Sequence, residues 1–369
     1  MKEALVIFRY PHAGNTCTIL KQDAYTLKTL PTLSDIGDTD GFVFAPFRMT
    51  EQTPILLFDK SDHLDSELDY DSIREIIKKE GTDTFLTEEL EPYHGKHYDR
   101  ASYEEDFNYL KGVIKDKRVD KIVLSRSLIV KHKERQDVVR LFVNACNNNP
   151  NSFVALVSSP ISGTWIVATP EVLLERVDNT LHTIALAGTK DKQLAKGHMD
   201  AGNKMTSKDV AGWDAKNIDE QQYVVAYIKD KLAKHFANIN VTAPTTIDAG
   251  NVLHLRSDFY VSCEETEMMD LGEIVSQLHP TPAVCGMPAA ESYNIINSRE
   301  HNDRRYYSGF CGMVRANADF RLFVTLRCME IYKDCYKLYA GGGILSESKL
   351  DEEWRETELK MKTMMDCIQ

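Results

Sequence analysis

The sequence predicts an α+β fold in which mainly antiparallel strands form layers, with helices inserted between them. Apolar strands flank two short polar turns, at residues 178–180 and 333–335, and each pair of strands is typical of a β-hairpin. Residues 218–236 are expected to form a long helix, because apolar side chains recur every four positions from Val224 to Leu232. Strands joined by hairpins, with helices inserted, are more typical of α+β layers than of a doubly wound parallel sheet.

The remaining elements follow from local periodicity. In the first 95 residues, apolar runs separated by polar loops predict three strands and one short helix, at 4–9, 41–47, 54–58 and 72–79. After residue 100, apolar periodicity predicts two amphipathic helices, at 103–115 and 136–146. Apolar and β-branched runs predict strands at 121–130, 153–158, 164–168, 172–177, 181–186, 322–332 and 336–339. No linker separates the two halves, so residues 1–95 are expected to pack on a core domain that spans 100–369.

The composition argues against several classes of protein. A formal net charge of −12 argues against nucleic-acid binding, and it means that an anionic substrate would need a local cation. No apolar run approaches the roughly 20 residues of a membrane span, and no export signal is present, so a cytoplasmic protein without a membrane partner is expected. The cysteines form no CxxC pair and are typical of reduced, buried thiols; they stand at positions 17, 146, 263, 285, 311, 328, 335 and 367.

Two residues at strand starts are candidates for acid–base chemistry. Lys121 opens an apolar strand, in which alternation places it on the same face as Val123 and Ser125. Such a lysine either keeps its ammonium group in water, or is held among apolar groups and serves as a general base. Glu171 follows a proline and precedes an apolar run, so it is either a solvated side chain or an enclosed general acid with a raised pKa.

The C-terminal region joins an apolar strand to an acidic helix through three glycines at 341–343. Glu353 and Glu356 are three residues apart and Lys360 follows at the next helical step, so these side chains share one helix face. Two carboxylates and an ammonium group beside a glycine turn can hold a divalent cation and an anionic substrate. Glu220, in the first turn of the long helix, either complements the helix dipole or points into the interior and binds a metal.

Further positions have both a structural and a functional interpretation. Arg327 interrupts an apolar strand, and a buried arginine requires an anion, which is either an internal carboxylate or a substrate carboxylate. Gly188 and Thr189 end a strand, where glycine permits either a plain turn or the close approach of a ligand. His279 lies in a loop made rigid by two prolines and is either structural or catalytic.

Taken together, seven segments in this order resemble the chorismate-binding domain of the isochorismate, salicylate and anthranilate synthase family. The resemblance covers about residues 100–369, whereas residues 1–95 match poorly, as is common for the variable N-terminal part of this family. Any one segment is a weak signal, but seven in order are specific. The segments are KIVLSR (121–126), ATPE (168–171), ALAGT (185–189), LHPTPAVCG (278–286), YSG (307–309), TLRC (325–328) and AGGGI through EWRET (340–357).

This resemblance implies a fold in which two layered α/β halves sandwich the active site, as in anthranilate synthase component I. Lys121 matches the general base of water-using members, and Glu171 matches the general acid. Glu220 and Glu356 match Mg²⁺ ligands, with Glu353 close by. The positions that match substrate contacts are Gly188, Thr189, His279, Tyr307, Leu326, Arg327, Gly341 and Lys360.

The activity implied by the resemblance is the Mg²⁺-dependent conversion of chorismate to isochorismate. In this isomerisation water attacks ring carbon 2 and the hydroxyl group on ring carbon 4 leaves. The resemblance therefore implies chorismate as the substrate and no glutaminase subunit as a partner. Menaquinone biosynthesis is the expected pathway, and siderophore biosynthesis is the alternative.

Three other activities are alternatives. A salicylate synthase would go on to eliminate pyruvate, but Ala283 and the context of Ala187 are more similar to isochorismate synthases. An ammonia-using anthranilate or aminodeoxychorismate synthase is expected to carry glutamine in place of Lys121, and to continue differently after Thr189. A member that only binds is disfavoured, because all the motif carboxylates are present.

Overall fold

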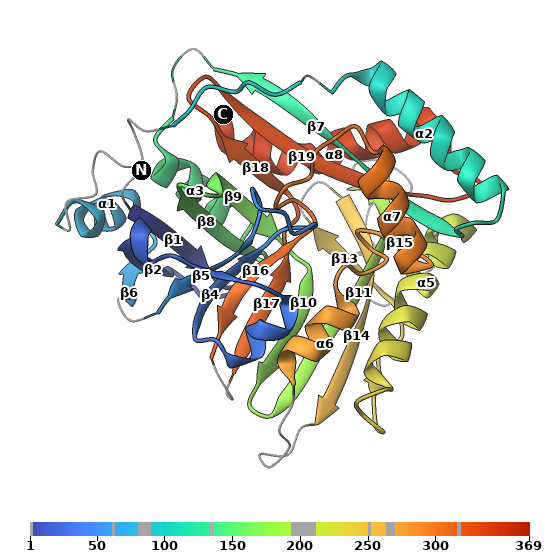
Figure 1. Cartoon of the computed structure of the whole chain (residues 1–369), viewed down its shortest axis with the longest axis horizontal. Coiled ribbons are helices and arrows are strands. Elements are labelled where there is room, and N and C mark those ends of the chain that lie inside the picture. The colour runs from blue at the N-terminus through green and yellow to red at the C-terminus, as the bar shows by residue number, and fades with distance from the viewer. Residues whose placement is uncertain are drawn as a thin grey trace, which may run out of the picture.

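Two antiparallel sheets form the centre of the molecule, and helices cover their outer faces (Figure 1). The computed structural model describes residues 3–60, 63–79, 90–96, 98–132, 134, 136–192, 212–249, 252–262, 270–315 and 319–369. Within these residues the sheets have nine and ten strands. The predicted α+β class with mainly antiparallel sheets is confirmed.

In the first sheet, called sheet A, the strand that begins with Lys121 lies beside the strand that carries the three glycines. Val123 pairs with Gly343, and Ser125 pairs with Gly341. The order is β15 (Gly286–Met287), β7 (Lys121–Lys131), β19 (Cys335–Ile344), β18 (Cys328–Ile331), β9 (Gly163–Thr169), β8 (Phe153–Ser159), β1 (Glu3–Arg9), β2 (Thr16–Asp23) and β6 (His63–Glu67).

In the second sheet, called sheet B, the pairing of its two longest strands shifts between Ala187 and Thr189. Gly188 takes the extra position at a φ of 71°, a conformation that glycine adopts without strain. The order is β12 (Asn240–Val241), β14 (Val252–Ser262), β11 (Thr180–Asp191), β10 (Val172–Val177), β17 (Phe320–Val324), β16 (Phe310–Val314), β4 (Gly41–Ala45), β5 (Ile55–Asp59) and β3 (Lys28–Leu30), and β13 (Thr245–Ala249) pairs with β14.

Strand alternation divides the core into layers. In β4, Phe42 and Phe44 face sheet A, whereas Val43 faces the helices on the other side. Between the sheets the rings of Phe153 and Phe323 stack with centroids 4.2 Å apart, which joins β8 of sheet A to β17 of sheet B. The central strands of each sheet, such as β8 and β4, are therefore buried on both faces, and they are apolar at nearly every position.

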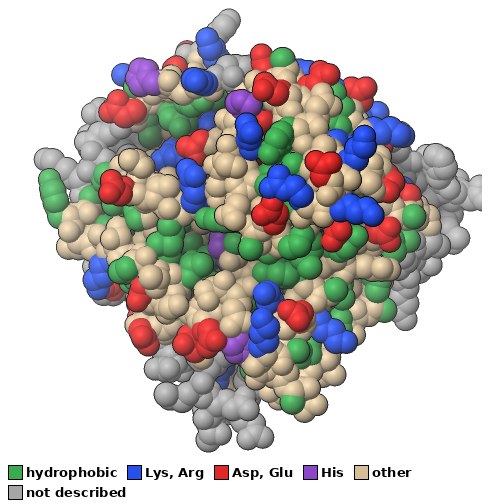
Figure 2. Space-filling view, turned by 45° about the vertical axis from the view of Figure 1, so that its right-hand side comes forward, with side chains coloured by type: hydrophobic (Ala, Val, Ile, Leu, Met, Phe, Trp, Pro, Cys, Tyr) green, Lys and Arg blue, Asp and Glu red, His purple; other side chains and the backbone are tan. Residues whose placement is uncertain are grey.

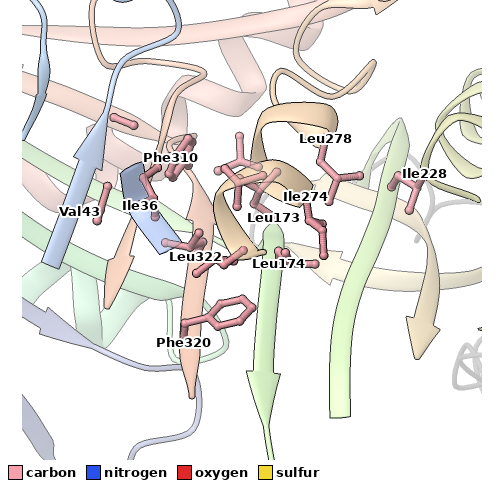
Figure 3. Packing of buried hydrophobic residues seen from close by; sticks show 14 of the residues in the cluster. Ile36, Val43, Leu173, Leu174, Ile228, Ile274, Leu278, Phe310, Phe320 and Leu322 are labelled. Carbon is pink, nitrogen blue, oxygen red and sulfur yellow. The ribbon is translucent and has the colours of Figure 1, made fainter. Parts of the chain in front are cut away.

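The helices pack on the outer faces through their apolar sides. Those on sheet A are α1 (Tyr70–Lys79), α3 (Val138–Asn148) and α8 (Leu350–Ile368). Those on sheet B are α5 (Ala215–Leu232) and α6 (Leu271–Leu278), and Figure 3 shows Ile274 and Leu278 of α6 beside Leu173 and Leu174 of β10. α2 (Arg100–Lys115) and α7 (Ala289–Arg299) pack against β7, and two 3-10 helices, η1 (Ala24–Thr26) and η2 (Leu33–Asp38), connect N-terminal strands.

The N-terminal strands are part of both sheets. β1 pairs with β8 in sheet A, and β4 pairs with β16 in sheet B, so segments far apart in the sequence lie side by side (Figure 1). The described residues before 95 therefore contribute strands to both sheets. The division into residues 1–95 and 100–369 stays a prediction from sequence.

The expected strand at 322–332 is wrong, and the reason matters for the site. The chain forms β17 in sheet B, leaves it after Val324, and enters β18 in sheet A at Cys328. Arg327 stands at this crossing with a φ of 46°, which lies outside the extended region and is uncommon for a residue other than glycine. The apolar character of both strands hid the break, because each is buried in a different sheet.

Other expectations are confirmed within one to three residues at most ends, including β1, β7, α2 and α3, whereas α5 begins three residues earlier and ends four residues earlier than expected. Sequence patterns missed β2, β14, α6 and α7, which alternate imperfectly or are short. Seven cysteines are free and buried as predicted, and Cys263 lies outside the described residues. Among the helices that the structure describes, none is long and apolar enough to cross a membrane.

On the face of the molecule seen in Figure 2, basic and acidic side chains are interspersed.

One charged cluster on sheet B is bonded across three neighbouring strands. His182 of β11 lies 2.7 Å from Glu175 of β10 through Nδ1 and 2.8 Å from Asp258 of β14 through Nε2. Both ring nitrogens can donate at the same time only when the ring is a protonated imidazolium. Burial lowers the pKa of His182, but the hydrogen bonds to both carboxylates favour the imidazolium and outweigh burial, so the pKa is raised.

We expect His182→Gln to destabilise the protein in a pH-dependent way. A raised folded-state pKa means that the stabilisation is full below the unfolded pKa of 6.5 and is lost as pH rises through the folded value. The free energy of unfolding should fall by about 1–3 kcal/mol at pH 6, and by less at pH 9. Urea unfolding at the two pH values checks this, and an equal loss at both would contradict it.

Candidate active site

A cavity lies where the two sheets meet, and both contribute to its wall. It brings together most of the candidate residues, although they come from distant parts of the chain. The lining residues are Val123, Pro170, Glu171, Leu186, Ala187, Gly188, Thr189, Glu220, His254, Ala283, Val284, Tyr307, Leu326, Arg327, Tyr339, Ala340, Gly341, Gly342, Gly343 and Lys360.

Arg327 reaches this cavity because the chain crosses between the sheets at its position. Its guanidinium donates to His254 Nε2 at 2.7 Å and to Thr363 Oγ1 at 3.5 Å. Among the described residues it makes no ion pair with a carboxylate, and burial lowers its pKa to about 10. The internal salt bridge that we considered is therefore not found there, and the guanidinium is free to hold an anion.

His254 is a site residue that sequence reasoning missed. Its Nδ1 lies 2.7 Å from the carbonyl oxygen of Gly188, which can only accept, so Nδ1 carries the proton and Nε2 accepts from Arg327. Burial and the charge of Arg327 lower its pKa to about 3, which keeps the ring neutral. A histidine within the apolar run Val252–Leu255 was the available signal.

Gly188 and Thr189 form a rigid part of the wall. The bulge at Gly188 turns its carbonyl toward His254, and the N–H of Thr189 donates to Asn217 Oδ1 at 2.8 Å. Asn217 is in turn fixed by the N-cap of α5, because its own N–H donates to Asp214 at 2.8 Å. The end of β11 and the start of α5 are thus tied together at the cavity.

Lys121 lies behind the glycine strand. It is fully buried, and its Nζ is 3.0 Å from Glu220 Oε1 on α5. A Cβ at Gly343 would lie 2.7 Å from Lys121 Cε and 2.3 Å from Glu220 Oε1, so only glycine lets these side chains approach. Of the two alternatives for this lysine, the structure shows the enclosed one, because the sheets and α5 surround its side chain.

Glu171 enters the cavity from the opposite sheet, one residue before β10. It is 4% exposed, and burial raises its pKa to about 7 although Lys121, Lys360 and Arg327 oppose the shift. Its backbone is fixed, because its carbonyl accepts from the N–H of Val324 at 2.9 Å. Of the two alternatives for Glu171, a solvated side chain or an enclosed carboxyl group, the structure shows the enclosed carboxyl group.

The start of α8 delivers two carboxylates to the other side of the glycine strand. Lys360 donates to Glu356 at 2.6 Å and to the carbonyl of Gly341 at 2.8 Å. Burial raises the pKa of Glu356, but Lys360 and Lys216 outweigh it, so the pKa is lowered. Burial and the charge of Glu356 instead raise the pKa of Glu353 to about 7.

The Tyr307 ring forms another wall and leaves little room at the glycine strand. It stacks on Tyr339 with centroids 5.5 Å apart, and a Cβ at Gly341 would lie 2.9 Å from its hydroxyl. Leu326 lines the cavity beside Arg327.

His279 does not line the cavity. Its ring packs against Phe310 with centroids 5.0 Å apart, and burial lowers its pKa to about 4. Ala283 and Val284, a few residues on in the same loop, line the cavity instead. The structure thus places this loop at the site but points its histidine into the core of sheet B.

Comparison with known proteins identifies the family. Residues 50–369 match the family model described as Chorismate binding enzyme. The chain belongs to the chorismate binding enzyme family. The match covers every candidate residue named above.

Proteins similar in sequence to this chain include three isochorismate synthases. The vibriobactin-specific isochorismate synthase of Vibrio cholerae is 28% identical over 264 residues, which cover 71% of this chain and 65% of that protein. The isochorismate synthase DhbC of Bacillus subtilis is 29% identical over 308 residues, or 79% and 75% of the two chains. The isochorismate synthase EntC of Escherichia coli is matched over 63% of its length, so the chain spans less than two thirds of the first and third of these proteins.

Solved structures show the same fold. A DhbC protein from Bacillus anthracis superposes with a TM-score of 0.78 at 24% identity, covering 100% of this chain and 96% of that one. MenF, the menaquinone-specific isochorismate synthase of Escherichia coli, gives 0.74 at 21% identity, covering 99% and 89%. Anthranilate synthase component I from Streptococcus pneumoniae gives 0.67 at 15% identity, which agrees with the predicted architecture.

The carboxylate oxygens of Glu220, Glu353 and Glu356 are ligands of the kind that Mg²⁺ prefers. Glu353 Oε2 is buried and has no hydrogen-bond partner among the described residues. A Cβ at Gly342 would lie 3.1 Å from that atom and 3.3 Å from Glu356 Oε1, so both carboxylates converge on one point. The described part of the chain holds no group of three metal-ligating side chains, and each of the three carboxylates is paired with a lysine.

Proposed function

We propose that this protein is an isochorismate synthase, which converts chorismate to isochorismate with Mg²⁺. One observation carries the proposal: the buried carboxyl group of Glu171 and the guanidinium of Arg327 line one cavity, and the buried Lys121 lies behind the glycine strand that forms its wall. The named relatives, which are isochorismate synthases, support the same activity. They include vibriobactin-specific and MenF proteins, so the proposal ends at isochorismate and names no pathway.

In the proposed reaction Lys121 and Glu171 act as base and acid. Lys121 takes a proton from the water molecule that attacks ring carbon 2. Glu171 gives a proton to the hydroxyl group on ring carbon 4, which leaves as water while the ring double bonds shift. One water molecule enters and one leaves, so substrate and product are isomers. The pKa of about 7 lets Glu171 hold its proton near neutral pH.

Lys121 must be the neutral amine to accept that proton. The structure shows an ion pair between Lys121 and Glu220, which a neutral amine cannot make. Catalysis therefore requires that another cation neutralises Glu220. Mg²⁺ held by Glu220 and Glu356, with Glu353 beside them, would supply that cation and bind one substrate carboxylate. This links the charge state of Lys121 to the carboxylates of α5 and α8.

Arg327 would hold the other substrate carboxylate. His254 and Thr363 fix the guanidinium, and neither of them neutralises it. A planar guanidinium can donate two parallel hydrogen bonds to a carboxylate. The site thus offers cationic groups to a dianion within an acidic protein.

We expect Arg327→Gln to raise the KM for chorismate by about 30-fold or more, because a buried charged hydrogen bond is lost. The free energy of unfolding should not fall, since the guanidinium is buried without a carboxylate partner among the described residues. Steady-state kinetics and urea unfolding measure the two quantities. An unchanged KM with a large loss of stability would mean that Arg327 is structural.

Product analysis tests the proposed function. Purified protein is incubated with chorismate and Mg²⁺, with a parallel sample containing EDTA, and the products are resolved by liquid chromatography. Isochorismate that is lost with EDTA is the expected result. Salicylate with pyruvate, or an aminated product with ammonium salts, would replace the proposal by another activity of the family, and no product under any condition would overturn it.

A further inference from the structure

Each of the three carboxylates assigned to the metal is neutralised by a lysine. Lys121 pairs with Glu220 at 3.0 Å, Lys360 pairs with Glu356 at 2.6 Å, and Lys216 donates to Glu353. When all six groups are charged, the three carboxylates and three ammonium groups sum to zero. A divalent cation added to this arrangement would meet no net attraction, so at least one ammonium group must leave for it to bind well.

Lys216 is placed against its local preference. It is the second residue of α5, where the helix dipole disfavours a positive charge. It stands one helical step before Glu220, on the same face of the helix. Burial lowers its pKa, but the charges of Glu353, Glu356 and Glu220 outweigh it and raise the pKa. The positive charge of Lys216 is therefore stabilised by these three carboxylates and not by the helix.

The lysines differ in how firmly they are held. Lys121 is fully buried, and Lys360 also donates to the carbonyl of Gly341. The side chain of Lys216 is 20% exposed, which gives it a path to solvent. Its partner Glu353 is 1% exposed and keeps Oε2 without a hydrogen bond among the described residues, so Glu353 still has a free oxygen that faces Glu356 across Gly342.

We propose that Lys216 is a built-in counter-ion of the metal site, which holds Glu353 beside Glu356 in the metal-free protein and gives way to the divalent cation. Lys216 thereby weakens cation binding and stabilises the empty site. This inference rests on the metal assignment of the proposed function. It predicts that removing the ammonium group has opposite effects on the two states.

Direct cation titration tests this role without turnover. Mn²⁺ is titrated into the protein in the absence of chorismate, and free Mn²⁺ is measured by electron paramagnetic resonance. Lys216→Met should bind Mn²⁺ at least about tenfold more tightly than the unaltered protein, because a competing charge next to the carboxylates is gone. Equal or weaker binding would overturn the inference.

Lys349→Met is the matched control. Lys349 pairs with Glu352 at 2.8 Å at the start of α8, but both side chains are exposed. The substitution changes the net charge by the same amount and should leave Mn²⁺ affinity unchanged. A gain as large as that of Lys216→Met would assign the effect to net charge and overturn the inference.

Thermal unfolding supplies the second readout. Without metal, Lys216→Met should unfold at a lower temperature than the unaltered protein, since Glu353 and Glu356 then repel each other without a counter-ion. Saturating Mg²⁺ should raise its Tm more than that of the unaltered protein. An unchanged metal-free Tm together with an unchanged response to Mg²⁺ would contradict the counter-ion role.

A second variant keeps the test decisive if Lys216→Met does not fold. In Lys216→Arg the guanidinium can hold Glu353 bidentately, so Mn²⁺ binding should be weaker than in the unaltered protein, and tighter binding would overturn the inference. Failure of the proposed function shows separately. If Lys216→Met shows the expected change in Mn²⁺ affinity but the protein does not turn over chorismate, only the proposed activity is refuted. If chorismate is turned over but the variant and the unaltered protein bind Mn²⁺ equally, only the counter-ion role of Lys216 is refuted.

Discussion

Lys121→Gln should lower kcat for chorismate by about 10²–10⁴-fold, which is the usual contribution of a general base. The amide is close to lysine in length and can donate a hydrogen bond to Glu220 in place of the ion pair, but it cannot accept a proton from water. The buried environment of residue 121 is thus kept while the base is removed. Steady-state rates of isochorismate formation at saturating Mg²⁺ measure the effect.

Lys131→Gln is the control for this prediction. Lys131 ends the same strand, β7, but is exposed and far along the strand from the glycines. It should keep the activity of the unaltered protein. A Lys121→Gln variant with near-normal kcat would show that another group takes the proton, and the role assigned to Lys121 would be wrong.

Glu171→Gln should also lower kcat by about 10²–10⁴-fold, because the amide cannot protonate the leaving hydroxyl group. Burial that raises the pKa of Glu171 to about 7 has a second consequence. In the unaltered protein, kcat should fall as pH rises above about 7 and Glu171 loses its proton. Initial rates from pH 6 to pH 9 test this, and a rate that keeps rising through pH 8 would contradict it.

Stability should change in the opposite direction to activity at this position. A carboxyl group whose pKa rises from 4.5 to about 7 on folding destabilises the protein as pH increases across that interval. At pH 8 Glu171→Gln should therefore raise the free energy of unfolding, by about 3 kcal/mol, and at pH 4 it should have little effect. Glu104→Gln, at an exposed position of α2, is the control for urea unfolding. A loss of stability at pH 8 would mean that Glu171 is held by interactions that favour its charge.

Residues that stand at strand starts or on one helix face could be predicted from the sequence. Strand alternation placed Lys121 with Val123 on one face, and helical spacing placed Glu353, Glu356 and Lys360 together. These are local relations, fixed by the repeat of a strand or a helix. The resemblance to a family then gave them roles that spacing alone left open.

Relations across the two sheets could not be predicted. Arg327 stands where the chain passes from one sheet to the other, and a continuous apolar run gave no sign of that crossing. His254 and Lys216 enter the site through contacts with Arg327 and Glu353, which are distant in sequence. Their roles depend on which strands pair, and pairing is decided by the whole core.

The N-terminal half shows the same limit. Its apolar runs predicted β1, β4 and β5, but not that β1 would pair with β8 and β4 with β16. Long-range pairing of this kind is favoured by burial on both faces, which a local pattern does not encode.

The origin of the oxygen atom in the product tests the central claim most directly. Chorismate is turned over briefly with Mg²⁺ in oxygen-18 water, before the reverse reaction proceeds, and isochorismate is analysed by mass spectrometry. Attack by water activated at Lys121 predicts that the hydroxyl group on ring carbon 2 carries one solvent oxygen. Isochorismate without the label would mean that the substrate's own hydroxyl group migrates, and the assigned roles of Lys121 and Glu171 would be contradicted.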